Sequence, residues 1–140
     1  MNTFYLRAYL GAFITFCVMD GLWLGVLATD FYYGALGELL LKEPNWPVAI
    51  VFYLGYIAGI VYFAIRPSLG RGSYFTVFRD GAMFGLMAYA TYDMTNMATL
   101  KGWSLSVAIV DIFWGIVITG TSSIVGYKLA CVPPTNSPFN

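Results

Sequence analysis

The sequence contains no histidine and few charged residues. Histidine is the commonest general base and the commonest zinc ligand, so its absence leaves carboxylates, tyrosines and thiols for proton chemistry. Only 10% of the 140 residues are charged and 59% are apolar, whereas a soluble domain has about 25% charged residues. The formal net charge is zero and no basic patch is present, which excludes nucleic acid as a partner.

Cysteine is also scarce. The two cysteines, Cys17 and Cys131, are too few for a disulfide framework. Cys17 lies within an apolar segment, and Cys131 directly follows another, a position at which thiols can be palmitoylated. An unmodified thiol at Cys131 is the alternative, and the sequence leaves this choice open.

Four long apolar segments dominate the chain and predict an all-α, polytopic bundle of four transmembrane helices. Each segment is close to the ~20 residues that cross a bilayer core of about 30 Å. Aromatic residues make up 19% of the chain, and many fall at the segment ends, as they do at membrane interfaces. We expect one transmembrane domain, residues 1–130, followed by a disordered cytoplasmic tail, residues 131–140. Its spans cover about residues 8–28, 46–65, 77–100 and 105–127.

The connection between the first two spans, residues 29–45, is long enough to contain a short helix in the membrane interface. Residues 33–42 would form this helix, with Leu36, Leu39 and Leu40 facing lipid. The second span has only tyrosine hydroxyls as polar groups. It is therefore expected to be a lipid-facing or packing helix rather than a helix that contributes to a site.

Basic residues near the span ends predict that both termini are cytoplasmic, because positive charge favours the cytoplasmic side of a membrane. Lys42 and Lys101 fall on the side opposite the termini. A larger group falls on the side of the termini, and we expect a multi-pass protein of the cell membrane. That group is Arg7, Arg66, Arg71, Arg79 and Lys128.

Three aspartates, Asp20, Asp93 and Asp111, lie within predicted spans. A carboxylate at the centre of a membrane helix costs roughly 2.5–3.5 kcal/mol on insertion scales, and such residues are functional candidates. Counted at 1.5 Å per residue from the span ends, all three lie about 10–12 Å below the outer surface. We expect them to face one another and to form a ligand-binding site. Interhelical hydrogen bonds contribute only about 0.6–2 kcal/mol, which argues against a purely structural role.

Other polar residues share helix faces with these aspartates. Tyr89 and Asn96 lie one turn from Asp93, and the Thr95 hydroxyl is a further candidate partner for a buried carboxylate. On the fourth span, Thr119 continues a stripe of small and polar residues that begins at Asp111. We expect all of these side chains to line the ligand site.

Two tryptophans, Trp23 and Trp114, follow Asp20 and Asp111 by three residues each. At this Asp-x-x-Trp spacing an indole can wall a pocket and donate its N–H to the preceding carboxylate. An aromatic residue that faces lipid is the alternative. Pairs of glycines four residues apart, which permit close helix packing, occur at positions 21 and 25, 55 and 59, and 81 and 85.

A resemblance to a known family rests on three segments: Asp20-Gly-Leu-Trp-Leu-Gly25, Thr91-Tyr-Asp-Met-Thr-Asn-Met-Ala-Thr-Leu100 followed by Trp103, and Asp111-Ile-Phe-Trp-Gly115. They resemble the signature of the predicted bacterial membrane proteins grouped as domain of unknown function 2177. The likeness covers almost the whole chain except the tail. It implies a small polytopic protein of the bacterial inner membrane, and it implies no established activity.

Three classes of function fit these residues. The first is a site that binds or translocates a proton, a metal ion or a small cationic ligand, since an acidic cluster without basic residues attracts positive charge. Four helices are few for a transporter, so a homodimer or larger assembly would then be expected. The second is an enzyme that modifies a lipid or isoprenoid, with Asp93 and Asp111 as acid and base and Asn96 orienting the substrate. The third is a non-catalytic membrane assembly factor. We expect the first class of function, in a protein surrounded by the lipid bilayer. The residues identify no cofactor and no particular metal.

Overall fold

The structure is a computed structural model that describes residues 3–70 and 73–131. Within these ranges the chain is helical, with short connecting turns and no strand. The predicted tail falls outside the described residues from position 132 onward, as does Arg71. The helices are α1 (Thr3–Leu22), α2 (Thr29–Leu36), α3 (Trp46–Ile60), α4 (Tyr74–Thr99) and α5 (Leu105–Cys131).

Short irregular turns extend three of these helices. α1 continues into a π-helical turn at Trp23–Leu27, and α2 ends in a 3-10 turn at Gly37–Leu39. α3 continues into a π-helical turn at Val61–Ile65 and a 3-10 turn at Arg66–Ser68. The helical rods that contain α1 and α3 are therefore long enough to cross a bilayer core.

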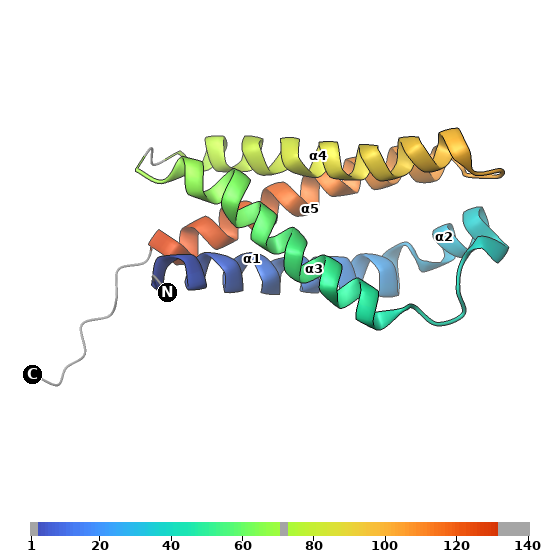
Figure 1. The fold of residues 1–140 in the computed structure, drawn as a ribbon, viewed down its shortest axis with the longest axis horizontal. Helices are drawn as coiled ribbons and strands as arrows, with labels where there is room; N and C mark the ends of the chain where they lie inside the picture. Colours follow the sequence, from blue (N-terminus) through green and yellow to red (C-terminus); the bar gives the residue numbers. More distant parts are fainter. Residues whose placement is uncertain (1–2, 71–72, 132–140) are drawn as a thin grey trace, which may run out of the picture.

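Local sequence signals explain where α3 and α4 begin. The Asn45 side chain accepts a hydrogen bond from the Val48 amide at 3.4 Å, and a proline stands in the first turn of α3. Ser73 caps α4 in the same way, accepting from the Thr76 amide at 3.3 Å. Gly102, with φ of 81°, turns the chain between α4 and α5. The two helices therefore pack side by side in opposite directions (Figure 1).

α5 is the central helix of the bundle. It packs along α4 on one side and along α1 on the other, while α3 crosses the bundle obliquely (Figure 1). The start of α1 and the end of α5 lie at one end of the molecule, and α2 lies at the opposite end, close to the turn between α4 and α5 (Figure 1). We refer to these as the terminal end and the α2 end.

The described residues contain three helical segments long and apolar enough to cross a membrane: Thr3–Leu27, Trp46–Ser68 and Leu105–Cys131. α4 is long enough at 26 residues, about 39 Å, but it is not apolar enough to belong to this group. Its composition explains the difference, since it carries Arg79, Asp80 and Asp93 together with several threonines. An all-α membrane protein with several candidate spans is confirmed; the span predicted over residues 77–100 remains a proposal.

The apolar core occupies the terminal half of the bundle. Phe16 of α1, Ile57 and Ile60 of α3, Val77 of α4 and Ile118 of α5 are at most 1% exposed there. Apolar side chains elsewhere point outward: Leu6, Leu10, Ile14, Val18 and Leu22 form a stripe along α1 at four-residue spacing, 41–58% exposed. Such a stripe is what a bilayer covers.

Two expectations were wrong, one about a helix that faces lipid and one about close packing at a glycine pair. The helix after the first span covers Thr29–Leu36 rather than residues 33–42, and its Leu36 is buried in the bundle instead of facing lipid. Gly21 and Gly25 contact no other element, because a Cβ at either position would meet nothing within 4 Å. Close packing is provided instead at Gly81 and Gly85, which lie against α5.

Candidate functional site

Asp20 joins three helices in the α2 half of the bundle. It lies near the end of α1 and is only 7% exposed. One carboxylate oxygen accepts a hydrogen bond from the Tyr53 hydroxyl of α3 at 2.6 Å, and the other accepts from the Trp114 indole of α5 at 3.2 Å. Both oxygens therefore have donors from neighbouring helices, as a buried carboxylate requires.

Asp111 on α5 also accepts a hydrogen bond from a neighbouring helix, and its link to a tryptophan is indirect. The Tyr32 hydroxyl of α2 donates to Asp111, and that hydroxyl in turn accepts from the Trp23 indole at 3.1 Å. Burial, followed by the hydrogen bond to Asp111, raises the pKa of the Tyr32 hydroxyl above its ordinary value. Tyr32 therefore remains a neutral donor at any physiological pH, and α2 is fixed to α5 through this contact.

The two Asp-x-x-Trp sequences are paired across α1 and α5. These helices are antiparallel (Figure 1), and the Trp114 indole reaches Asp20 while the Trp23 indole reaches Asp111 through the Tyr32 hydroxyl. The two indoles stack between the carboxylates, with ring centroids 4.4 Å apart and planes at 11°. Neither indole donates to its own preceding aspartate, as the spacing had suggested: Trp114 donates to Asp20, and Trp23 donates to the Tyr32 hydroxyl.

A cavity of about 750 Å³ opens beside this network at the α2 end. Both carboxylates line it, and aromatic side chains form much of its wall. Its volume falls within the ~300–1,000 Å³ of ordinary ligand sites. Among the described residues that line it there is no lysine or arginine, so the lining carries only negative formal charge. The aromatic residues of the wall include Trp23, Tyr32, Tyr53, Tyr89, Trp103 and Trp114.

Five of the predicted site residues line this cavity, and four do not. The lining residues are Asp20, Trp23, Tyr89, Asp111 and Trp114. Thr95 is exposed on the opposite face of α4, two residues and about 200° from Asp93, and its hydroxyl donates to the backbone carbonyl of Tyr92 at 3.1 Å. Its predicted place in the site was wrong. Outside the cavity lining lie Asp93, Thr95, Asn96 and Thr119.

Thr119 lies deeper than the cavity, two turns along α5 from Asp111. It is fully buried and its hydroxyl shares a hydrogen bond of 2.9 Å with Tyr56 of α3. Asn96 is partly buried one turn beyond Asp93, beside Tyr92. Neither residue lines the cavity: Thr119 contacts Tyr56, and Asn96 lies beside Tyr92.

Asp93 is the most unusual group in the described chain. It is 0% exposed, and neither carboxylate oxygen has a hydrogen-bond partner. The indole N–H of Trp103 is buried beside this carboxylate, within range of an interaction with it but outside the geometry of a regular hydrogen bond. Asp93 is close enough to Asp111 for their charges to interact, as Asp111 is to Asp20. The three aspartates thus gather at the α2 end, but with unequal surroundings.

Comparison with known families gives one match. The profile of a family described as predicted membrane protein, domain of unknown function 2177, matches residues 5–128. The chain belongs to this family. The matched range includes every residue of the cavity and of the hydrogen-bond network described above. No curated protein and no solved structure matches the chain.

For this member of the domain of unknown function 2177 family, the structure adds tyrosines that the sequence did not identify. Tyr53 and Tyr56 lie one turn apart on one face of α3, and both donate or share hydrogen bonds inside the bundle. The expectation that the second span serves only packing was wrong. The spacing of two hydroxyls on one face of an otherwise apolar helix was the available signal.

Tyr32→Phe tests the hydrogen-bond network. The change removes the donor to Asp111 and the acceptor of the Trp23 indole, so we expect the free energy of unfolding to fall by about 1–2 kcal/mol. Tyr33→Phe is the matched control, because Tyr33 is exposed on the same helix and no hydrogen bond is described for its hydroxyl. Thermal unfolding of the purified protein in detergent, followed by tryptophan fluorescence, measures both. Equal melting temperatures for the two variants would contradict the network.

Proposed function

We propose that the protein crosses the cell membrane four times, with both termini in the cytoplasm and α4 as the third span. α4 packs along α5 and is of comparable length (Figure 1). Its exposed large side chains are mostly apolar, with Phe75, Met83 and Met87 56–73% exposed. The polar Asp93 and the glycines instead face the bundle. The excess of basic residues at the terminal end supports the orientation.

Reporter insertion tests this topology. Alkaline phosphatase, which is active only outside the cytoplasm, should be active when inserted after Gly102, in the turn between α4 and α5. A fluorescent protein that matures only in the cytoplasm should fluoresce when fused to the C-terminus. An inactive phosphatase at Gly102 would show that α4 does not cross the membrane.

The function that the geometry supports best is the binding of a small organic cation in the α2-end cavity. The observation that carries this proposal is a cavity with two carboxylates, aromatic walls and no basic residue among its described lining. Aromatic faces attract cations and contribute about 0.5–2 kcal/mol per contact, and a nearby carboxylate adds direct charge attraction. A quaternary or alkylated ammonium group can make both interactions, one with the aromatic faces and one with the carboxylates.

A metal ion fits this cavity less well than an organic cation. No group of three or more acidic or cysteine side chains in the described ranges could hold a metal ion. Both oxygens of Asp20 already accept hydrogen bonds from Tyr53 and Trp114. The cavity is also larger than a bare ion needs, and an aromatic wall is not required to hold one.

The enzymatic alternative, acid–base chemistry on a lipid by Asp93 and Asp111, is less well supported. Both carboxylates would have to reach the substrate, and only Asp111 lines the cavity. A purely structural role as an assembly factor explains the hydrogen bonds of Asp20. It leaves the unpartnered Asp93 and the open cavity without a purpose.

Choline is a suitable probe of this proposal, with 3,3-dimethylbutan-1-ol as its neutral carbon isostere. We expect choline to change the fluorescence of Trp23 and Trp114 in a saturable way, and the neutral isostere to have little effect. Asp111→Asn should weaken choline binding roughly tenfold, about 1.4 kcal/mol, because the amide oxygen can still accept from Tyr32 while the charge is removed.

Glu38→Gln is the control for a general effect of charge, since Glu38 lies at the same end, is exposed and does not line the cavity. It should bind choline as the unchanged protein does. Equal binding of choline and its isostere, or unaltered affinity in Asp111→Asn, would reject the cation site. A lipid missing from cells that lack the protein would instead favour the enzyme.

A further inference from the structure

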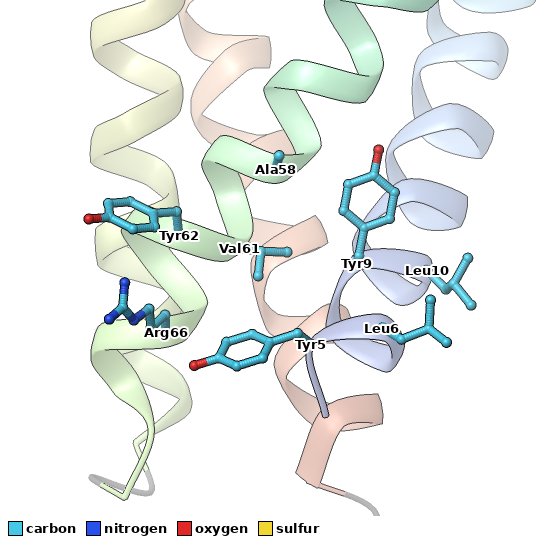
Figure 2. Close-up of a pocket in the computed structure, with 8 residues that line it drawn as sticks. All are labelled: Tyr5, Leu6, Tyr9, Leu10, Ala58, Val61, Tyr62 and Arg66. Atoms are coloured by element: carbon cyan, nitrogen blue, oxygen red, sulfur yellow. The ribbon is translucent and has the colours of Figure 1, made fainter. Parts of the chain in front are cut away.

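A second cavity, of about 740 Å³, lies in the terminal half between α1 and the end of α3 (Figure 2). Its lining is almost entirely apolar or aromatic, and it is separate from the aspartate-lined cavity in every residue. α1 contributes Tyr5, Tyr9 and Leu10, and the α3 rod contributes Val61, Tyr62 and Arg66.

A hydrogen bond between the helices lies beside the groove. The Tyr9 hydroxyl of α1 donates to the backbone carbonyl of Leu54 on α3 at 3.0 Å. From there α3 leans away from α1 toward the terminal end, so the space widens as it approaches Tyr5 and Arg66 (Figure 2). The groove is open on the outside of the bundle, on the face that the exposed stripe of α1 shares.

Arg66 supplies the only formal charge among the described residues of this groove. Its guanidinium lies 5.1 Å from the centre of the Tyr62 ring, and no acidic partner is described for it in residues 3–70 and 73–131. Arg66 is 20 residues beyond Trp46, which opens α3, so the two are about 30 Å apart along the helix. An oblique rod of this length covers most of the hydrocarbon core, so Arg66, at the terminal end of the rod, is expected near the lipid headgroups.

We propose that this groove binds an anionic phospholipid, with an acyl chain between α1 and α3 and the phosphate on Arg66. Guanidinium groups bind phosphate in a bidentate manner, and the anionic lipids of a cytoplasmic leaflet attract basic residues near the membrane surface. The widening apolar groove accepts the chain, and the Tyr5 and Tyr62 rings lie where interfacial aromatics are favoured. The site is independent of the cation cavity and would remain if that proposal failed.

Native mass spectrometry of the full-length protein tests the proposal. The protein is released from micelles that contain equal amounts of phosphatidylglycerol and phosphatidylcholine with the same acyl chains. We expect at least fivefold more phosphatidylglycerol to stay bound. Arg66→Gln should remove this preference, Arg66→Lys should retain part of it, and Arg79→Gln should not change it, because Arg79 is already paired with Asp80 at 2.8 Å.

Ala58→Phe tests the groove separately from the charge. Ala58 lines the groove and is exposed, so a phenyl ring there fills the space without entering the core (Figure 2). It should reduce retention of the lipid although Arg66 is intact. Equal retention of the two lipids, or no effect of Arg66→Gln or of Ala58→Phe, would overturn the proposal. If the protein forms dimers and Ala58→Phe abolishes them, the groove holds a second copy of the chain, and the lipid proposal is overturned.

Discussion

Gly85→Ala is expected to lower the free energy of unfolding by about 3 kcal/mol, the upper part of the range for overpacked interiors. A Cβ at this position of α4 would overlap the backbone carbonyl of Gly115 on α5 and would lie 2.7 Å from the Thr119 hydroxyl. A backbone carbonyl in a helix cannot turn aside as the end of a flexible side chain can. The two helices would have to separate along their whole contact, and this is the most extensive contact in the bundle.

Gly21→Ala is the control for the loss of a helical glycine. A Cβ at Gly21 would meet nothing within 4 Å, so alanine there should change stability by no more than about 1 kcal/mol, in the stabilising direction. Thermal unfolding of both variants in the same detergent measures the difference. Similar melting temperatures for the two would show that α4 and α5 are not packed as closely as the structure indicates.

The close approach at Gly85 also determines where Asp93 lies. Val77, Gly81, Gly85, Tyr89 and Asp93 follow one another at four-residue spacing and form the face of α4 that packs on α5. Tyr89 lies against Gly115 in this stripe. Asp93 is buried because it continues a packing face of α4.

The sequence was sufficient to predict an all-α chain with several helices long and apolar enough to cross a membrane. Apolar length alone identifies such helices. It was sufficient for Tyr89 as well, because residues four apart share a helix face. These inferences depend only on the regular geometry of a single helix.

The partners of the aspartates could not be predicted in this way. Trp114 bonds Asp20, and Trp23 reaches Asp111 through Tyr32, because α1 and α5 are antiparallel neighbours. Neighbour choice and rotation about each axis are properties of the whole bundle. Tyr32 depends further on α2 folding back toward α5, and helix periodicity carries no information about that turn.

α4, which we propose as a membrane span, shows a limit of hydropathy alone. α4 buries the carboxylate of Asp93 in the bundle and exposes Met83 and Met87, while Arg79 and its threonines lie on the exposed faces or at the ends of the helix. A mean over all residues of a helix cannot distinguish polar groups turned inward from polar groups exposed to lipid. Only the packing partner makes that distinction, and the sequence of α4 does not contain it.

Asp20→Asn and Asp93→Asn are expected to change stability in opposite directions. Asp20 accepts hydrogen bonds on both oxygens, and an asparagine amide would present its N–H₂ to either Tyr53 or Trp114. We expect the free energy of unfolding to fall by about 1–3 kcal/mol, the cost of one buried donor left unpaired. Asp93 has only the Trp103 indole beside it. An asparagine keeps an oxygen for that indole and removes the buried charge, and this gain exceeds the cost of its unpaired N–H₂, so we expect the free energy of unfolding to rise by about 1–2 kcal/mol.

The same two variants separate a structural from a functional role for Asp93. A carboxylate that destabilises the fold is retained only where its chemistry is needed. Asp93→Asn should therefore be more stable than the unchanged protein and altered in choline affinity, through its charge interaction with Asp111. A destabilised Asp93→Asn protein with unaltered choline affinity would mean that Asp93 serves only to hold α4 in place. Thermal unfolding and a choline titration on one preparation of each variant decide between these outcomes.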